Sequence, residues 1–160
     1  MLSISTNIET FRLGIQVRDL ASTFRDAIKM TEWLGFRYIW IDSLCIIQDS
    51  LTDWEVQSSL MASVYGSTEL VLAASIASST EEGFLKVERT GYRETSLKIS
   101  GNKKSVLNLK YRLLNPIDVF PMLEPLEYRA WALEERLLAR QYLAIGSYDT
   151  TWACTTCSAC

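Results

Sequence analysis

Acid/base chemistry in this sequence cannot use histidine, because none of its 160 residues is a histidine. This excludes Ser-His-Asp and Cys-His nucleophile systems and histidine-dependent zinc sites, so proton transfer must rest on carboxylates, lysine, tyrosine or cysteine. Glu135 follows Trp131 by four residues, a spacing that stacks both side chains on one helix face. A carboxylate beside an indole suits glycosidic chemistry, because it can stabilise an oxocarbenium-like centre or act as a nucleophile. The alternative is that residues 134–136 form a solvated face with ordinary ion pairs.

Two further polar side chains are candidates for binding a substrate. Asp42 lies inside the apolar run 38–47, where a carboxylate is costly to bury unless it is paired. It falls near the end of a predicted strand, where α/β folds assemble their sites. Its alternative role is structural, either capping a helix or pairing with Arg25 or Arg129. Gln48 has the groups to hold a ligand amide or a ribose hydroxyl, and equally those to anchor a loop.

The four cysteines predict neither a disulfide framework nor a metal site. Cys45 stands alone in an apolar run, where we expect a packed, inert thiol. Cys154, Cys157 and Cys160 have zinc-like spacing, but a structural zinc needs four ligands and no histidine completes the set. We therefore expect reduced thiols and no bound metal.

Composition indicates one domain of 18.2 kDa with a formal net charge of −3. No basic run is dense enough to track phosphates, so nucleic acid is not an expected partner. The longest apolar stretches fall far short of the roughly 20 residues that span a bilayer. The N-terminus lacks the features of a signal peptide, which predicts a cytoplasmic protein. A glycine-rich phosphate loop is also missing, so a Rossmann-type cofactor site is not predicted.

The first half of the chain alternates helical and strand-like patterns. A helix is predicted from Ser22 to Leu34, with Thr23 and Asp26 resembling a capping box and Gly35 ending it. The aromatic and β-branched run 38–47 predicts a buried, parallel strand covered on both faces. A second helix follows from a cap at Asp53 to Thr68, and a second buried strand over residues 69–75. This alternation favours an α/β fold.

The second half carries weaker patterns. The segments 96–100 and 105–109 flank Gly101-Asn102 and predict a small β-hairpin that need not join the main sheet. Three prolines predict a loop before residue 129, because proline is excluded from long helices and central strands. A helix over residues 129–140 and two short strands about Gly146 complete the prediction.

Several strings together resemble the fungal heterokaryon-incompatibility (HET) domain. They are TFRDAI (23–28), YIWIDSLCIIQD (38–49), DW (53–54), Met61 with VY (64–65), GFL (83–85), RAWALEERLL (129–138) and WAC (152–154). They keep the order of the family and span about residues 17 to 154. The resemblance implies a doubly wound α/β sheet, distantly similar to Toll/interleukin-1-receptor (TIR) domains and to flavodoxin. It also implies a cytosolic module that triggers growth arrest or cell death after non-self recognition.

Two features depart from the family pattern. The family opens with a strand block of the type Y-x-x-LSY-x-WG, and residues 1–21 do not supply it. We therefore expect an N-terminally incomplete HET domain over residues 17–160, preceded by a poorly defined segment at 1–16. Ala153 also stands where the family's WEC-like block has glutamate.

The likeness to TIR domains, some of which cleave NAD, implies a specific site. TIR enzymes carry a helical W-C-x-x-E string with a catalytic glutamate, and residues 131–135 reproduce its Trp-to-Glu spacing. On this interpretation Glu135 is catalytic, NAD is the substrate, and no cofactor is needed. The substrate-binding candidates are Asp42, Gln48, Arg129 and Trp131. The alternatives are a non-enzymatic module that associates with itself or with other HET-type allorecognition proteins, and an inactive truncated remnant.

Overall fold

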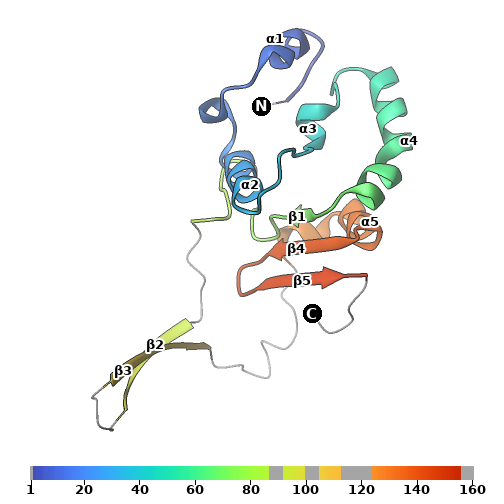
Figure 1. Cartoon of the computed structure of the whole chain (residues 1–160). Helices are drawn as coiled ribbons and strands as arrows, with labels where there is room; N and C mark the ends of the chain where they lie inside the picture. Colours follow the sequence, from blue (N-terminus) through green and yellow to red (C-terminus); the bar gives the residue numbers. More distant parts are fainter. Residues whose placement is uncertain (1, 87–91, 100–104, 113–123, 156–160) are drawn as a thin grey trace.

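A computed structural model describes residues 2–86, 92–99, 105–112 and 124–155 of the chain (Figure 1). It is an α/β structure in which helices flank a three-stranded mixed sheet. The helical elements are α1 (Ile8–Leu13), η1 (Val17–Asp19), α2 (Ser22–Trp33), α3 (Asp42–Cys45), α4 (Leu51–Ser67), η3 (Pro125–Tyr128) and α5 (Ala130–Leu138). The strands are β1 (Val71–Ala73), β2 (Tyr92–Ile99), β3 (Ser105–Arg112), β4 (Gln141–Ile145) and β5 (Thr150–Cys154). The predicted α/β class is confirmed.

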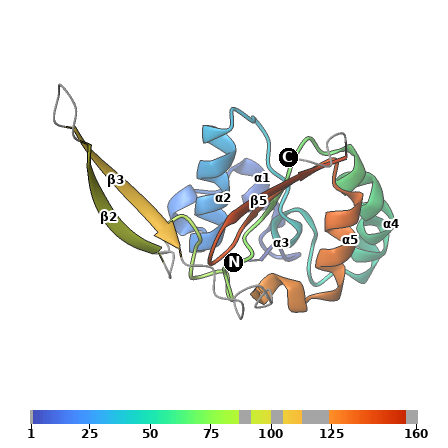
Figure 2. The same cartoon turned by 90° about the horizontal axis from the view of Figure 1, so that it is seen from below.

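The main sheet has the order β1-β4-β5 and combines both kinds of pairing. β1 runs parallel to β4, with Leu72 opposite Leu143, and β5 runs antiparallel to β4, with Trp152 opposite Leu143. Figure 2 shows α2 on one side of this sheet and α4 with α5 on the other. The two strands predicted about Gly146 are therefore confirmed as an antiparallel pair. The sheet is mixed because β4 pairs in parallel with β1 and antiparallel with β5.

Two small hydrophobic clusters hold the helices in place. One joins the sheet to α4 and α5 and consists of Val71, Ala73, Ala139, Tyr142 and Ala144, with Tyr65 and Leu126 packed against it. The other consists of Leu20, Ala21 and Phe24, and side chains from the 41–44 region pack against it. The amphipathic α2 thus covers α3, while α4 and α5 form the layer that borders the sheet. These contacts place α5 beside α4, with Tyr65 near the C-terminal end of α4 packed against the cluster that includes Ala139.

β2 and β3 form a separate two-stranded antiparallel sheet, with Thr95 opposite Leu109. This confirms the added β-hairpin and its independence from the main sheet. The predicted turn at Gly101-Asn102 and most of the proline-containing loop lie outside the described residues.

The prediction of a buried, parallel strand over residues 38–47 is wrong. Residues 37–41 include extended backbone but no strand, and Tyr38 is 83% exposed. Asp42–Cys45 then forms the short helix α3, because the carbonyl of Ile41 accepts hydrogen bonds from the amides of Leu44 and Cys45. The helical turn thus uses backbone amide and carbonyl groups that a strand would offer to a neighbouring strand. Only Ile46 is buried in this run.

The helix starts differ in detail from the prediction. Thr23 and Asp26 do not form a capping box in α2; the Asp26 carboxylate instead accepts hydrogen bonds from the amides of Phe84 and Leu85, at 2.8 and 3.0 Å. In α4 the cap is Ser50, whose side chain accepts from the Asp53 amide at 3.2 Å. Asp53 reaches back to the Ile47 amide at 2.7 Å. The Asp26 carboxylate therefore binds the backbone of a loop that faces α2. The Asp53 carboxylate binds the backbone just before α4.

Candidate functional site

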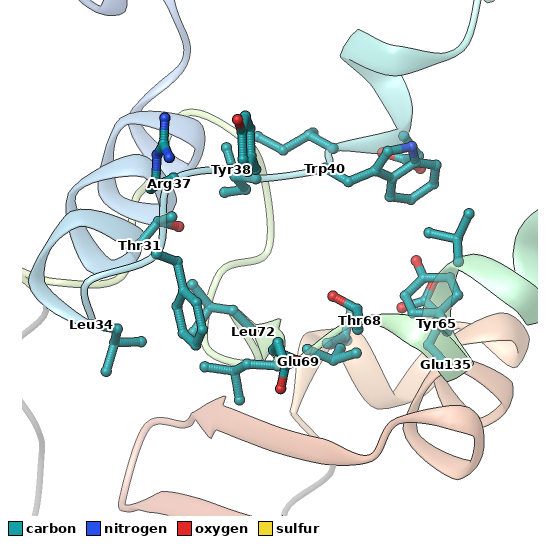
Figure 3. Close-up of a pocket in the computed structure, with 18 of the residues that line it drawn as sticks. Thr31, Leu34, Arg37, Tyr38, Trp40, Tyr65, Thr68, Glu69, Leu72 and Glu135 are labelled. Atoms are coloured by element: carbon teal, nitrogen blue, oxygen red, sulfur yellow. The ribbon is translucent and has the colours of Figure 1, made fainter.

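A cavity of about 490 Å³ opens between the 36–41 segment, the end of α4, β1 and the start of α5 (Figure 3). Its walls are mostly apolar and aromatic, and its charged lining residues are Arg37, Asp42, Glu69, Arg129 and Glu135. Concave sites of this size, apolar with a few convergent polar groups, are typical of small-molecule binding. The sequence positions that meet here lie as far apart as Thr31 and Glu135.

Glu135 is the most strongly perturbed carboxylate of this cavity. It projects from α5 toward Tyr65 at the end of α4, and both side chains line the cavity (Figure 3). Burial raises the pKa of Glu135, the Tyr65 hydrogen bond and the positive charge of Arg129 lower it, and the negative charges of Asp42 and Glu134 raise it. The net direction is upward, which brings the carboxyl closer to the range useful for proton transfer at neutral pH.

The surroundings of Tyr65 keep its phenol protonated. Burial, followed by the charge of Glu135, raises the pKa of the Tyr65 phenol far above its ordinary value. Its ring meets Trp40 edge to face, with the centroids 6.0 Å apart and the planes at 80°, an arrangement that aromatic quadrupoles favour. The phenol therefore stays protonated while it contacts the carboxylate.

The tryptophans offer aromatic surfaces to a planar ligand. Trp40 and Trp131 both line the cavity, and Trp131 is 62% exposed. An exposed indole beside a half-buried carboxylate has unused surface for stacking on a ring that enters the cavity. Together with the three carboxylates and two arginines of its lining, the cavity could hold a cationic heterocycle and polarise the bond that joins it to a sugar.

Four of the five predicted site residues meet at this cavity, namely Glu135, Asp42, Arg129 and Trp131. Asp42 lies at the start of α3 instead of on a strand, and its carboxylate accepts a hydrogen bond from the Ser43 amide at 2.6 Å. Gln48 is not among the lining residues. Its side-chain amide donates to the Ile46 carbonyl at 3.0 Å and the Asp42 carbonyl at 3.4 Å, so its observed contacts are those of a loop anchor.

The charged run on α5 does not form one solvated face. Glu135 is half-buried against Tyr65 and Glu134 is exposed. Arg136 stacks its guanidinium over the Tyr142 ring, 5.6 Å from the centroid. The three side chains therefore have three different environments, and only Glu135 faces the cavity.

The structure adds two residues that the sequence patterns did not single out, Trp40 and Tyr65. Trp40 falls in the run interpreted as a buried strand, and Tyr65 belongs to α4, whose helical pattern gives no sign of a partner on α5. The only signal was their presence within the strings shared with the HET family.

The cysteines differ from the prediction at one position. Cys45 is exposed instead of packed in a core, because the residues around it form a helical turn with one side open. Cys154 is half-buried on β5, and Cys157 and Cys160 lie outside the described residues. Within the described ranges no group of three or more metal-ligating side chains occurs. In the same part of the chain, no helix has both the length and the apolar character to cross a bilayer.

The fold and cavity define a class: an α/β protein with a carboxylate and aromatic pocket at the junction of two helices and a sheet. The sequence profile described as "Heterokaryon incompatibility protein (HET)" matches residues 3–135. The chain therefore belongs to the HET family, and the predicted resemblance is confirmed. No curated protein and no solved structure matches the chain significantly.

Proposed function

We propose that this HET-family chain acts in fungal non-self recognition and cell-death signalling by cleaving NAD in the cavity beside Glu135. The observation that carries the proposal is the meeting of Glu135, Asp42 and Arg129 in one cavity with exposed aromatic surface. The resemblance of residues 131–135 to the catalytic string of TIR enzymes supports the same assignment. The proposed location is the cytoplasm, where NAD is available.

The proposed reaction breaks the bond between ribose C1′ and the nicotinamide nitrogen. The bonding electron pair leaves with nicotinamide, which neutralises the pyridinium, and positive charge develops on the ribose. The ionised Glu135 stabilises that charge and accepts a proton from the water that attacks C1′. The products are nicotinamide, ADP-ribose and one proton, with no cofactor required.

The surrounding side chains have distinct proposed tasks. Trp40 and Trp131 flank the nicotinamide ring, since aromatic faces attract a cationic heterocycle. Arg129, which precedes α5, attracts the phosphates of the dinucleotide. Asp42 offers a second carboxylate to a ribose hydroxyl.

The test is nicotinamide release from NAD by the purified chain, measured by chromatography, beside two variants. Glu135→Gln should abolish turnover, because the carboxamide keeps the shape but loses the charge. Glu134→Gln is the matched control and should stay active, because an adjacent helical residue projects about 100° away. Circular dichroism checks that all three proteins fold. A Glu135→Gln protein as active as its parent would remove this carboxylate from the mechanism.

A second candidate is a signalling module that associates with itself or with other HET-type proteins without chemistry. Large apolar side chains on the helices favour it: Trp54 is 54%, Leu133 62% and Leu137 73% exposed. Leu133 and Leu137 lie four residues apart on α5 and so share one face of that helix, and exposed apolar side chains that share a face are a common mark of protein contacts. A folded parent that releases no nicotinamide but forms oligomers by light scattering, lost in a Leu133→Ser, Leu137→Ser double variant, would favour this candidate.

A further inference from the structure

The cavity separates two stretches of main chain. Consecutive residues 36–42 form one wall, and consecutive residues 68–72, which run into β1, form the opposite wall. Figure 3 shows Arg37 and Tyr38 along the first wall and Leu72 along the second. Successive side chains of an extended chain point to opposite faces. A cavity that touches every residue of such a run therefore meets its edge, where the backbone N–H and C=O groups lie.

Both walls have backbone groups without partners. In the described part of the chain, β1 pairs with β4 alone, so its other edge is free. Across the cavity, Ile41 has φ −130 and ψ 117, which is extended backbone. Within the described ranges, no amide of residues 37–41 donates a backbone hydrogen bond. Unpaired edges are templates for a further strand, and here two of them face the same space.

The side chains around this space are apolar and incompletely covered. Leu34, Phe36 and Ile39 line it and are exposed, as is Tyr38. Because α2 lies on one side of the sheet and α4 with α5 on the other (Figure 2), a strand between the two walls would have helices over both of its faces. A strand covered on both faces is apolar along its whole length. The space therefore fits a short apolar strand by its backbone groups and by its side chains.

We propose that the slot between residues 36–39 and 70–72 accepts an apolar β-strand of another protein chain. This strand pairs with β1 on one side and with the 37–41 backbone on the other, so that main-chain hydrogen bonds supply affinity. β1 spans about 10 Å, and the slot therefore holds about three to five residues of extended chain. Each of the five described strands is already paired within this chain, so a second copy has no unpaired strand to donate.

The slot lies at the end of the cavity away from Glu135. Figure 3 shows Arg37 and Leu72 at one end and Trp40 with Glu135 at the other. Strand binding is thus a further function of the chain, and it does not depend on whether NAD is cleaved.

The test uses the synthetic peptide acetyl-KVYVIVK-amide, whose apolar centre suits a strand covered on both faces and whose lysines keep it soluble. Hydrogen exchange of the parent chain is measured by NMR with and without this peptide. With the peptide at about ten times its Kd, exchange should slow about tenfold at the amides of residues 38–41 and at the free edge of β1. The matched control is the same peptide with its valine amides N-methylated, which keeps the side chains but cannot donate from one edge. It should bind about tenfold more weakly or worse.

A protein variant locates the contact. Ile39→Glu places a charge in the slot and should weaken peptide binding about tenfold or more. Leu13→Glu is its control, because Leu13 is 92% exposed and lies outside the cavity lining; its affinity should equal that of the parent. Circular dichroism checks both folds, and the comparison of the two peptides on the parent chain decides the matter if Ile39→Glu does not fold.

Three results would overturn the proposal. One is that the peptide does not bind, or binds as well when N-methylated. Another is that it binds without slowing exchange at both walls. The third is exchange at both walls that slows as the concentration of the parent chain alone is raised, which would assign the slot to a second copy.

Discussion

The segment after β1 is fixed to α2 through one buried glycine, which makes Gly83→Ala a sharp perturbation. Gly83 has φ +74, and a Cβ placed on it would lie 2.6 Å from Oδ2 of Asp26. The same oxygen accepts the amides of Phe84 and Leu85 at 2.8 and 3.0 Å, and the Gly83 amide donates to the Thr23 hydroxyl at 3.2 Å. A methyl group here must displace the carboxylate that holds the segment.

Two costs add up for this substitution. Placing alanine in the left-handed region costs about 1–2 kcal/mol. Moving Asp26 weakens two charge-assisted hydrogen bonds, and losing the equivalent of one costs about 1.5–3 kcal/mol. We expect Gly83→Ala to lower the free energy of unfolding by about 2.5–5 kcal/mol. For a chain of this size that corresponds to a fall in Tm of about 5–20 °C.

The assay is urea and thermal unfolding followed by circular dichroism. Gly66→Ala is the matched control, because Gly66 lies within α4 and a Cβ added there would meet nothing within 4 Å; it should gain about 0.5–1 kcal/mol from helix propensity. In an Asp26→Ala background the cost of Gly83→Ala should fall to the backbone contribution of about 1–2 kcal/mol. A Gly83→Ala protein within about 0.5 kcal/mol of its parent would refute the reasoning.

Two further predictions concern stability. Ser50→Ala should lower the free energy of unfolding by about 1 kcal/mol, because it removes the cap that accepts the Asp53 amide; urea unfolding beside Ser59→Ala, an exposed site within α4, checks it. Glu135→Gln should raise Tm at pH 7 by about 1–3 °C. The pKa of Glu135 is higher in the folded than in the unfolded state, so its ionisation at neutral pH destabilises the fold, and glutamine removes that ionisation. That gain should vanish as the pH falls below the ordinary pKa of the carboxyl, and melting curves from acidic to neutral pH measure it.

Each of these has a result that contradicts it. Equal unfolding midpoints for Ser50→Ala and its parent would mean that water replaces the cap without loss. A Glu135→Gln protein less stable than its parent at pH 7 would mean that the contacts with Tyr65 and Arg129 outweigh the burial of the charge.

The sequence patterns located most helices and the strands of the main sheet. α2 and α4 follow from apolar residues at helical spacing, and β4 with β5 from short apolar runs on either side of Gly146. These patterns involve residues that are close in the sequence, so they can be recognised without knowledge of the tertiary contacts. The strand prediction over residues 38–47 failed because a continuous apolar stretch has no period. Such a stretch fits a paired strand as well as an extended segment followed by a helical turn.

The candidate site was predicted only in part, for a related reason. The spacing of Trp131 and Glu135 is a property of one helix and can be recognised in the sequence. The contact of Tyr65 with Glu135 joins two helices far apart in the sequence, and depends on how both pack against the sheet. Gln48 was a reasonable candidate by type, but the local turn of the 42–48 segment uses its amide for backbone carbonyls.

The central claim is that Glu135 and its neighbours form a site for the nicotinamide end of NAD. The most direct measurement is a crystal structure of the Glu135→Gln protein with NAD, since this variant should bind the dinucleotide without consuming it. The account predicts the nicotinamide ring against Trp40 or Trp131, with ribose C1′ beside the carboxamide at position 135. NAD bound at another surface, or an empty cavity in a crystal saturated with NAD, would contradict it.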